Sequence, residues 1–106
     1  MTATHSAPLS PAVFHILLAL WGKERHGYDI MRQISEDTDG TLTMGPGTLY
    51  GSIDRMMEAG LVERSPKRDE PRRIYYRLTA KGKTVLRTET ERLRHAAAIA
   101  AERHVA

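Results

Sequence analysis

The stretch GPGTLYGSIDRMMEAGLVERSPKRDEPRRIYYRL, residues 45–78, decides the fold of this chain. It opens with Gly45 and Pro46, and proline suits the first turn of a helix because its missing N–H would have no partner there. Apolar residues then recur at helical spacing as far as Gly60. They are Leu49, Ile53, Met56 and Met57. The first half of the stretch therefore predicts an amphipathic helix that ends at Gly60.

The second half of the stretch predicts a basic hairpin. One strand starts at residues 61–62, residues 66–71 form a polar loop, and residues 73–78 alternate as a second strand. Alternation predicts that one face of this strand carries Ile74, Tyr76 and Leu78, and the other Arg73, Tyr75 and Arg77. Residues 61–83 hold eight basic and three acidic residues, whereas the net charge of the whole chain is only +3. Such a local excess of positive charge is typical of a surface that binds phosphate.

Two more helices are predicted upstream of this stretch. Ser10 caps the first helix, with Pro11 at its first position and Gly22 at its end. The second helix covers about residues 27–38 and ends near Gly40. The residues expected in the core are Val13, Ile16, Leu17, Leu20 and Trp21 of the first helix and Tyr28, Ile30, Met31 and Ile34 of the second. The outer face of the second helix is acidic, so we do not expect it to lie on phosphate.

The last predicted helix is too long to be buried on so small a body. Thr79 caps it, and it extends to about His104, which gives a length close to 40 Å at about 1.5 Å per residue. Its sparse apolar positions recur by sevens, and residues 96–101 are rich in alanine. We therefore expect the helix to pair with its counterpart in a second copy of the chain. The predicted dimer contacts are Leu86, Leu93, Ala97 and Ala100.

Length and composition limit the organisation of the chain. Its 106 residues support one domain. We predict a disordered tail over residues 1–9, a winged helix-turn-helix domain over residues 10–78 and a dimerisation helix over residues 79–106. The fold class is thus mainly α with a small β-hairpin (α+β). The chain lacks cysteine, and no stretch approaches the roughly 20 apolar residues that span a bilayer, so we expect a cytoplasmic protein without a membrane partner.

Three helices followed by a two-stranded wing present the third helix to the major groove of double-stranded DNA. Its outer surface is neutral to basic, and Gly47 and Gly51 allow the backbone to come close to a duplex. Arg55 is the best candidate for reading guanine, because its guanidinium donates two hydrogen bonds at once. The predicted DNA-binding residues are Thr48, Tyr50, Gly51, Ser52 and Arg55 on the helix and Lys67, Arg68, Arg72 and Arg73 in the wing.

Each of these assignments has a plainer alternative. Arg55 lies three residues before Glu58 and could form only a surface ion pair. Tyr50 could be a core residue, and a basic hairpin could be no more than a solvated surface. Four acidic residues also oppose phosphate binding near the proposed site. They are Asp54 and Glu58 on the third helix and Asp69 and Glu70 in the wing.

The sequence offers little for other chemistry. None of the five histidines forms a pair at three- or four-residue helical spacing, so we predict no metal site. No phosphate-binding glycine loop, pair of catalytic carboxylates or serine triad is recognisable, so we predict neither an enzyme nor a cofactor. Trp21 could line a pocket for a flat ligand, but a lone tryptophan on an apolar helix stripe is more simply a core residue.

Several short motifs resemble those of one known family. They are His26-Gly27-Tyr28-Asp29-Ile30, Gly47-Thr48-Leu49-Tyr50, Gly60-Leu61-Val62, and RIYYRLT at residues 73–79 with Gly82. Together they resemble the PadR family of transcriptional regulators over about residues 12–82, although Gly51 stands where the family commonly has proline. The resemblance implies a winged-helix dimer of the compact subgroup, held together by its C-terminal helix. It also implies a repressor released by a small molecule or another signal, with Tyr50 on the DNA backbone.

Three functions remain open from the sequence. The first is a dimeric repressor that binds an inverted-repeat operator and is released by a small-molecule effector. The second is a winged-helix protein–protein interaction module without sequence-specific DNA binding, which the acidic residues of the wing and the third helix favour. The third is a ligand-binding scaffold whose regulatory role depends on an effector between the terminal helices.

Overall fold

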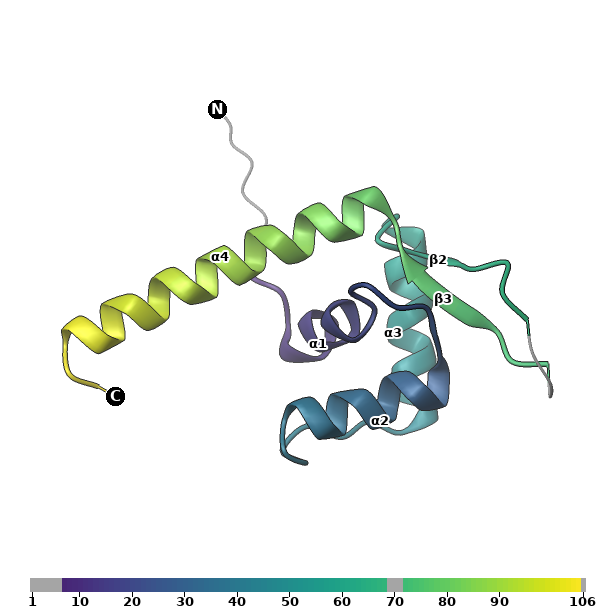
Figure 1. The fold of residues 1–106 in the computed structure, drawn as a ribbon, viewed down its shortest axis with the longest axis horizontal. Coiled ribbons are helices and arrows are strands. Elements are labelled where there is room, and N and C mark those ends of the chain that lie inside the picture. The colour runs from purple at the N-terminus through teal and green to yellow at the C-terminus, as the bar shows by residue number, and fades with distance from the viewer. Residues whose placement is uncertain (1–6, 69–71, 106) are drawn as a thin grey trace.

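The computed structural model describes residues 7–68 and 72–105. Within these ranges the elements follow the order α1 (Pro11–Ala19), β1 (Arg25–His26), α2 (Gly27–Asp37), α3 (Pro46–Glu58), β2 (Val62–Arg64), β3 (Tyr75–Leu78) and α4 (Ala80–Glu102). Helices α1 to α3 and the small sheet gather at one end of the molecule, and α4 extends away from them (Figure 1). Most of the predicted tail, residues 1–6, and the acidic loop residues Asp69 and Glu70 lie outside the described residues.

The helices begin where the capping residues predict. The Ser10 hydroxyl accepts a hydrogen bond from the Val13 N–H at 3.2 Å, and the Thr79 hydroxyl accepts one from the Gly82 N–H at 3.0 Å. Helix α3 has no side-chain cap and starts with Pro46 after an extended Gly45. The order of three helices, a β-hairpin and a long last helix confirms the predicted mainly helical fold of the winged helix-turn-helix type.

The core lies where the apolar stripes of α1, α2 and α3 meet. The most deeply buried side chains are Ile16, Leu17, Ile30, Ile34, Leu49, Ile53 and Val62. β2, β3 and the first turns of α4 add further side chains to the same cluster. Because this core holds one face of α3, the opposite face of the helix points outward.

The sheet has three strands, because β1 joins the predicted hairpin. Its order is β1-β3-β2, with β3 in the middle and both pairings antiparallel. Arg25 lies opposite Tyr76 and His26 opposite Tyr75. A strand of two residues is too short to produce an alternating pattern, so the sequence does not reveal it.

The added strand β1 also affects the burial of β3. Ile74 is 41% exposed, whereas Tyr75, which alternation places on the opposite face, is only 6% exposed. Tyr75 is covered because the His26 ring of β1 packs edge-on against it, with ring centroids 5.3 Å apart. β3 is thus buried on both faces and begins at Tyr75 rather than Arg73.

Two aromatic residues predicted for the core lie at the surface. Trp21 is 45% exposed and Tyr28 is 70% exposed. Helix α1 ends at Ala19, so Trp21 leaves the buried stripe, and the Arg87 guanidinium lies 5.0 Å from its ring centroid. Tyr28 lies in the first turn of α2, off the stripe that Ile30 and Ile34 bury. The core interpretation of Trp21 is therefore wrong.

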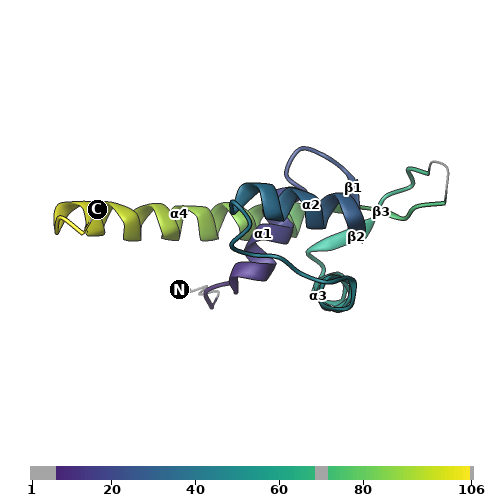
Figure 2. The ribbon, with the colours of Figure 1, turned by 90° about the horizontal axis from the view of Figure 1, so that it is seen from below.

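The two halves of α4 have different surroundings. Leu86 and Glu89, in the first half, are buried, whereas Leu93 is 41% exposed. The second half projects beyond the other helices (Figures 1 and 2). No helix in the described residues combines the length and the apolar character that a membrane crossing needs.

Candidate nucleic-acid interface

Helix α3 forms one edge of the molecule, with the sheet and the wing beside it (Figure 2). Its buried face consists of Leu49, Ser52, Ile53 and Met56. The residues on its outward side are Gly47, Thr48, Gly51, Asp54, Arg55 and Glu58. Because the inward face is closely packed, the outward residues keep a fixed position relative to the wing.

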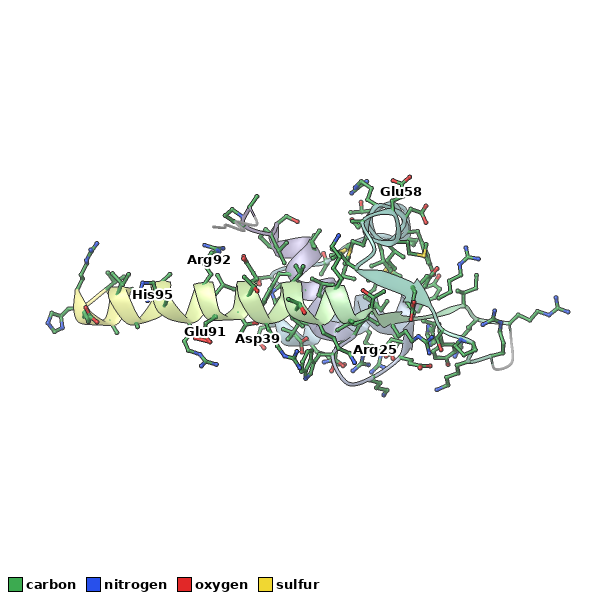
Figure 3. The ribbon with its side chains drawn as sticks, turned by 90° about the horizontal axis from the view of Figure 1, so that it is seen from above. Arg25, Asp39, Glu58, Glu91, Arg92 and His95 are labelled. Atoms are coloured by element: carbon green, nitrogen blue, oxygen red, sulfur yellow. The ribbon has the colours of Figure 1, made fainter. Side chains whose placement is uncertain are left out.

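The Arg55 side chain runs along this outward face toward the preceding turn of α3. Its Nη2 donates a hydrogen bond to the Ser52 hydroxyl at 3.3 Å. A Cβ on Gly51 would lie 3.7 Å from the Arg55 Nη1, so the guanidinium rests beside the bare backbone of Gly51. The hydrogen bond of Arg55 goes to Ser52 and not to Glu58, which points away from the body at the end of α3 (Figure 3).

Ser52 itself departs from its predicted place. Only 4% of the residue is exposed, so its hydroxyl does not present itself to a duplex. Ser52 directly precedes the buried Ile53 and lies on the same side of the helix as Ala59, seven residues later. It is therefore at the edge of the buried stripe. In the structure Ser52 supports the Arg55 guanidinium and is too deeply buried for the predicted direct contact with DNA.

Tyr50 lies between α3 and the start of α2. It is 39% exposed, and a Cβ on the buried Gly27 would overlap the Tyr50 hydroxyl. Burial, and next the neighbouring Tyr50, raise the pKa of the Tyr76 phenol. Tyr50 is therefore partly packed and partly open, as expected of a residue at the border of the apolar stripe.

Three of the four predicted cationic residues of the wing are oriented by neighbouring groups. Lys67 Nζ lies 4.6 Å from the Tyr75 ring centroid. Arg68 Nη1 donates to the carbonyl oxygens of Ser65 at 3.0 Å and Lys67 at 2.9 Å. Arg73 Nη1 lies 3.4 Å from His26 Nε2. Arg72 is exposed and has no comparable contact within the described parts of the chain.

The base of the wing is anchored by residues that the sequence pattern does not reveal. Ser65 is buried, donates its hydroxyl hydrogen to the Glu24 carboxylate and accepts the Lys67 N–H at 3.0 Å. Arg77 binds Glu63 at 2.8 Å and faces Glu24 at 4.0 Å. No periodicity marks Ser65 or Glu24, because they lie far apart in the sequence.

His26 also has a larger role than that of the turn residue the sequence predicts. Its Nδ1 accepts the Asp29 N–H at 3.3 Å and so caps α2. Its other ring nitrogen faces Arg73, so the imidazole connects the start of α2 to the wing. A histidine next to Gly27 at a helix start is the only sequence signal of this cap.

The acidic face of α2 is partly neutralised. Arg25 Nη1 binds Asp29 at 2.9 Å, and Arg32 binds the other oxygen of the same carboxylate. Burial alone would raise the pKa of Asp29, but the hydrogen bonds and charges of Arg25 and then Arg32 outweigh it and leave the pKa below its ordinary value. The start of α2 next to Tyr50 therefore repels an anion less than the sequence suggests.

The predicted dimer residues of α4 divide into two groups. Leu86 is 3% exposed and packs in the core of its own chain, so it departs from its predicted role as a contact between copies. Leu93 and Ala97 are exposed, and Ala100 is partly covered. Between the two groups the Glu89 carboxylate binds Arg92 at 2.6 Å and accepts the Leu9 N–H at 3.3 Å. Glu91 and Arg92 project from opposite sides of α4 (Figure 3).

The fold has counterparts in solved structures. A PadR family transcription regulator from Clostridium difficile R20291 has a TM-score of 0.75 and 25% identity, over 88% of this chain and 97% of its own. A transcriptional regulator from Clostridium thermocellum has a TM-score of 0.72 and 25% identity, over 86% of this chain and 87% of its own. Bacillus subtilis PadR, solved in complex with operator DNA, shares the fold with a TM-score of 0.60 and 22% identity, over 72% of this chain and 44% of its own.

Two sequence comparisons agree with this likeness. An uncharacterized protein from Lysinibacillus sphaericus is 33% identical over 73 residues, which cover 67% of each chain. The sequence model of the transcriptional regulator PadR-like family matches residues 16–88. The chain therefore belongs to the PadR-like family, whose members are transcriptional regulators and not enzymes.

Proposed function

We propose that the protein is a dimeric repressor that binds an inverted-repeat operator through α3 and the wing. The observation that carries this proposal is the outward face of α3, which the core holds next to a basic wing. Bacillus subtilis PadR has been solved with operator DNA, and its shared fold supports the same docking mode here. As a regulator of the genome, the protein acts in the cytoplasm.

The outward face of α3 reads the base sequence of the DNA. Gly51 lets the backbone approach the base edges, and Arg55 beside it donates two hydrogen bonds to the N7 and O6 of a guanine. In the structure Ser52 already holds this guanidinium. Thr48, about two turns before Arg55, lies on the same side of the helix and contacts a neighbouring base or phosphate.

Affinity comes chiefly from the phosphates. Tyr50 donates its hydroxyl hydrogen to a phosphate oxygen next to α3. The wing contributes positive charge through Lys67, Arg68, Arg72 and Arg73. Because each neutralised phosphate releases counterions, the affinity falls steeply as the salt concentration rises.

Two copies associate through the exposed half of α4. Leu93, Ala97 and Ala100 form the contact, and residues 79–106 serve as the dimerisation helix of the DNA-binding domain at residues 10–78. The two copies of α3 then enter successive major grooves about 34 Å apart, one helical turn of DNA. Truncation after Arg87 should therefore abolish the dimer, as sedimentation velocity would show.

An effector that releases the DNA fits between α1 and α4. A hollow of about 380 Å³ lies there, lined by Leu18, Trp21, Leu86, Arg87, Thr90, Glu91 and Arg94. The exposed ring of Trp21 and the guanidinium of Arg87 offer a flat surface to a planar molecule. Quenching of the single tryptophan by candidate effectors reports binding at this place directly.

The experiment that tests the proposed function is selection from a random duplex library at near-physiological salt. An enriched inverted repeat with half-sites one helical turn apart supports the repressor. A retained pool without a shared sequence contradicts it and favours the protein–protein interaction module, for which the exposed Asp54 and Glu58 on α3 are the supporting observation.

A further inference from the structure

Hydrogen bonds join the residues that follow α3 to the start of α4. The Thr79 N–H donates to the Leu61 carbonyl at 3.1 Å, and the Thr79 hydroxyl donates to the Gly60 carbonyl at 2.6 Å. The same hydroxyl accepts the Gly82 N–H. One side chain therefore caps α4 and holds the residues that follow α3.

Lys81 adds a third connection at this place. Its Nζ donates to the Ala59 carbonyl at 2.9 Å. The last carbonyls of a helix have no partner within the helix itself and are usually satisfied by a cap or by water. Here the first turn of α4 satisfies the carbonyls just beyond α3, which places the two helix ends side by side (Figure 1).

Gly82 makes the closest contact of this junction. It is buried, and a Cβ at this position would overlap the Leu61 carbonyl oxygen and lie 3.0 Å from the carbonyl carbon. The obstacle is backbone and not a flexible side chain, so it cannot move aside alone. Any residue larger than glycine must push the start of α4 away from the end of α3.

We propose that this junction, residues 59–61 with residues 79–82, determines which half-site spacing the dimer accepts. The proposal rests on the proposed function, because it requires a dimer formed through α4 and an operator read by α3. In a two-fold dimer the positions of both recognition helices relative to the axis follow from the angle between α3 and α4. The junction fixes the start of α4 relative to the end of α3. Leu86, which packs in the core, fixes the following turns of α4.

The geometry makes the spacing sensitive to small changes. Gly82 lies about 22 Å from Ala97 along the helix, at about 1.5 Å per residue. A tilt of about 10° at the junction moves the far end by about 4 Å, slightly more than the rise of about 3.4 Å per base pair. A tilt of this size, started by a methyl group at Gly82, would misalign a half-site by about one base pair.

The test uses duplexes that carry the selected half-sites with spacers shortened or lengthened by one or two base pairs. The proteins compared are the wild type, Gly82→Ala, Thr79→Val and Thr79→Ser, with Thr84→Ala as a control at an exposed position of the same helix. Fluorescence anisotropy gives each affinity, sedimentation velocity checks the dimer, and circular dichroism checks the fold. Thr79→Val serves as the second variant if Gly82→Ala does not fold.

We expect the wild type, Thr79→Ser and Thr84→Ala to prefer one spacing and to bind about tenfold more weakly one base pair away, as for a mismatched base pair. Gly82→Ala and Thr79→Val should shift or broaden this optimum while keeping the half-site sequence and the dimer. An unchanged optimum in both variants, or a wild type indifferent to spacing, overturns the inference alone. Failure of the wild type to select any inverted repeat overturns the proposed function as well.

Discussion

Helix α3 and the wing lie side by side, but their surface residues are held in different ways. The outward face of α3 is set by a buried face with Leu49 and Ile53 at its centre. Lys67, Arg68 and Arg73 of the wing are held only by a few neighbouring groups, such as Tyr75 for Lys67 and His26 for Arg73. A surface held by a packed core keeps the precise geometry that reading bases requires, whereas side chains held by a few neighbours can adapt to any phosphate backbone. We therefore propose that α3 reads the bases and that the wing supplies sequence-independent affinity.

The largest effect should follow from damage to the buried face of α3. Ile53→Ala removes a fully buried side chain, and it should lower the free energy of unfolding by about 2–5 kcal/mol. Thr48→Ala, on the exposed side of the same helix, should change it by less than about 0.5 kcal/mol. Urea unfolding followed by circular dichroism measures both. Similar values for the two variants would mean that the core does not fix this helix.

The wing should show a large effect on DNA binding without an effect on sequence preference. Arg72→Ala with Arg73→Ala should weaken binding to all duplexes and lower the slope of log affinity against log salt by about one for each phosphate that is no longer neutralised. Arg94→Ala with Arg103→Ala removes the same charge from exposed positions on α4 and directly after it and should leave the slope nearly unchanged. If the wing variant retained both its affinity and its slope, the wing would have no role in binding.

A smaller effect should come from the close approach of Gly27 to Tyr50. The methyl group of Gly27→Ala would displace the Tyr50 hydroxyl, and the absence of its hydrogen bond to phosphate should cost about 1 kcal/mol, or about fivefold in operator affinity. In a Tyr50→Ala background the same change at Gly27 should cost almost nothing. Additive effects in this double-mutant cycle would mean that Gly27 acts on binding by another route.

The smallest effect concerns Glu89, which lies outside both regions. The hydrogen bond from Arg92 holds the pKa of Glu89 below its ordinary value of 4.5. Its stabilising contribution should therefore be complete above pH 4.5 and disappear as the pH falls through the folded-state pKa. The difference in free energy of unfolding between wild type and Glu89→Gln should shrink from pH 7 to pH 3. A difference that does not change with pH would exclude this ion pair as its cause.

The sequence predicts those parts of the fold that rest on strong local signals. Ser10 and Thr79 cap their helices as expected, and Pro46 opens α3. β1 escapes prediction because a strand of two residues has no pattern, and this strand in turn buries Tyr75. Such errors arise from contacts between segments that are distant in the sequence.

The candidate site was predictable to a similar degree. The positions of Thr48, Gly51 and Arg55 on the outward face follow from the helical period, but Ser52 lies too close to the buried stripe to stay exposed. Leu86 and Leu93 occupy equivalent positions in the heptad pattern of α4, but only Leu86 is buried in the core of its own chain. The anchoring of the wing by Glu24 and Ser65 joins residues 41 positions apart, which no local pattern reveals.

The most direct test of the division between α3 and the wing compares the sequences that two variants select from the same random duplex library. Arg55→Ala should lose the preference for one base pair in each half-site, a discrimination of about 1–3 kcal/mol. Arg72→Ala with Arg73→Ala should select the wild-type sequence at lower affinity. If Arg55→Ala selected the wild-type sequence unchanged and the wing variant selected a different one, the assignment of readout to α3 would be contradicted.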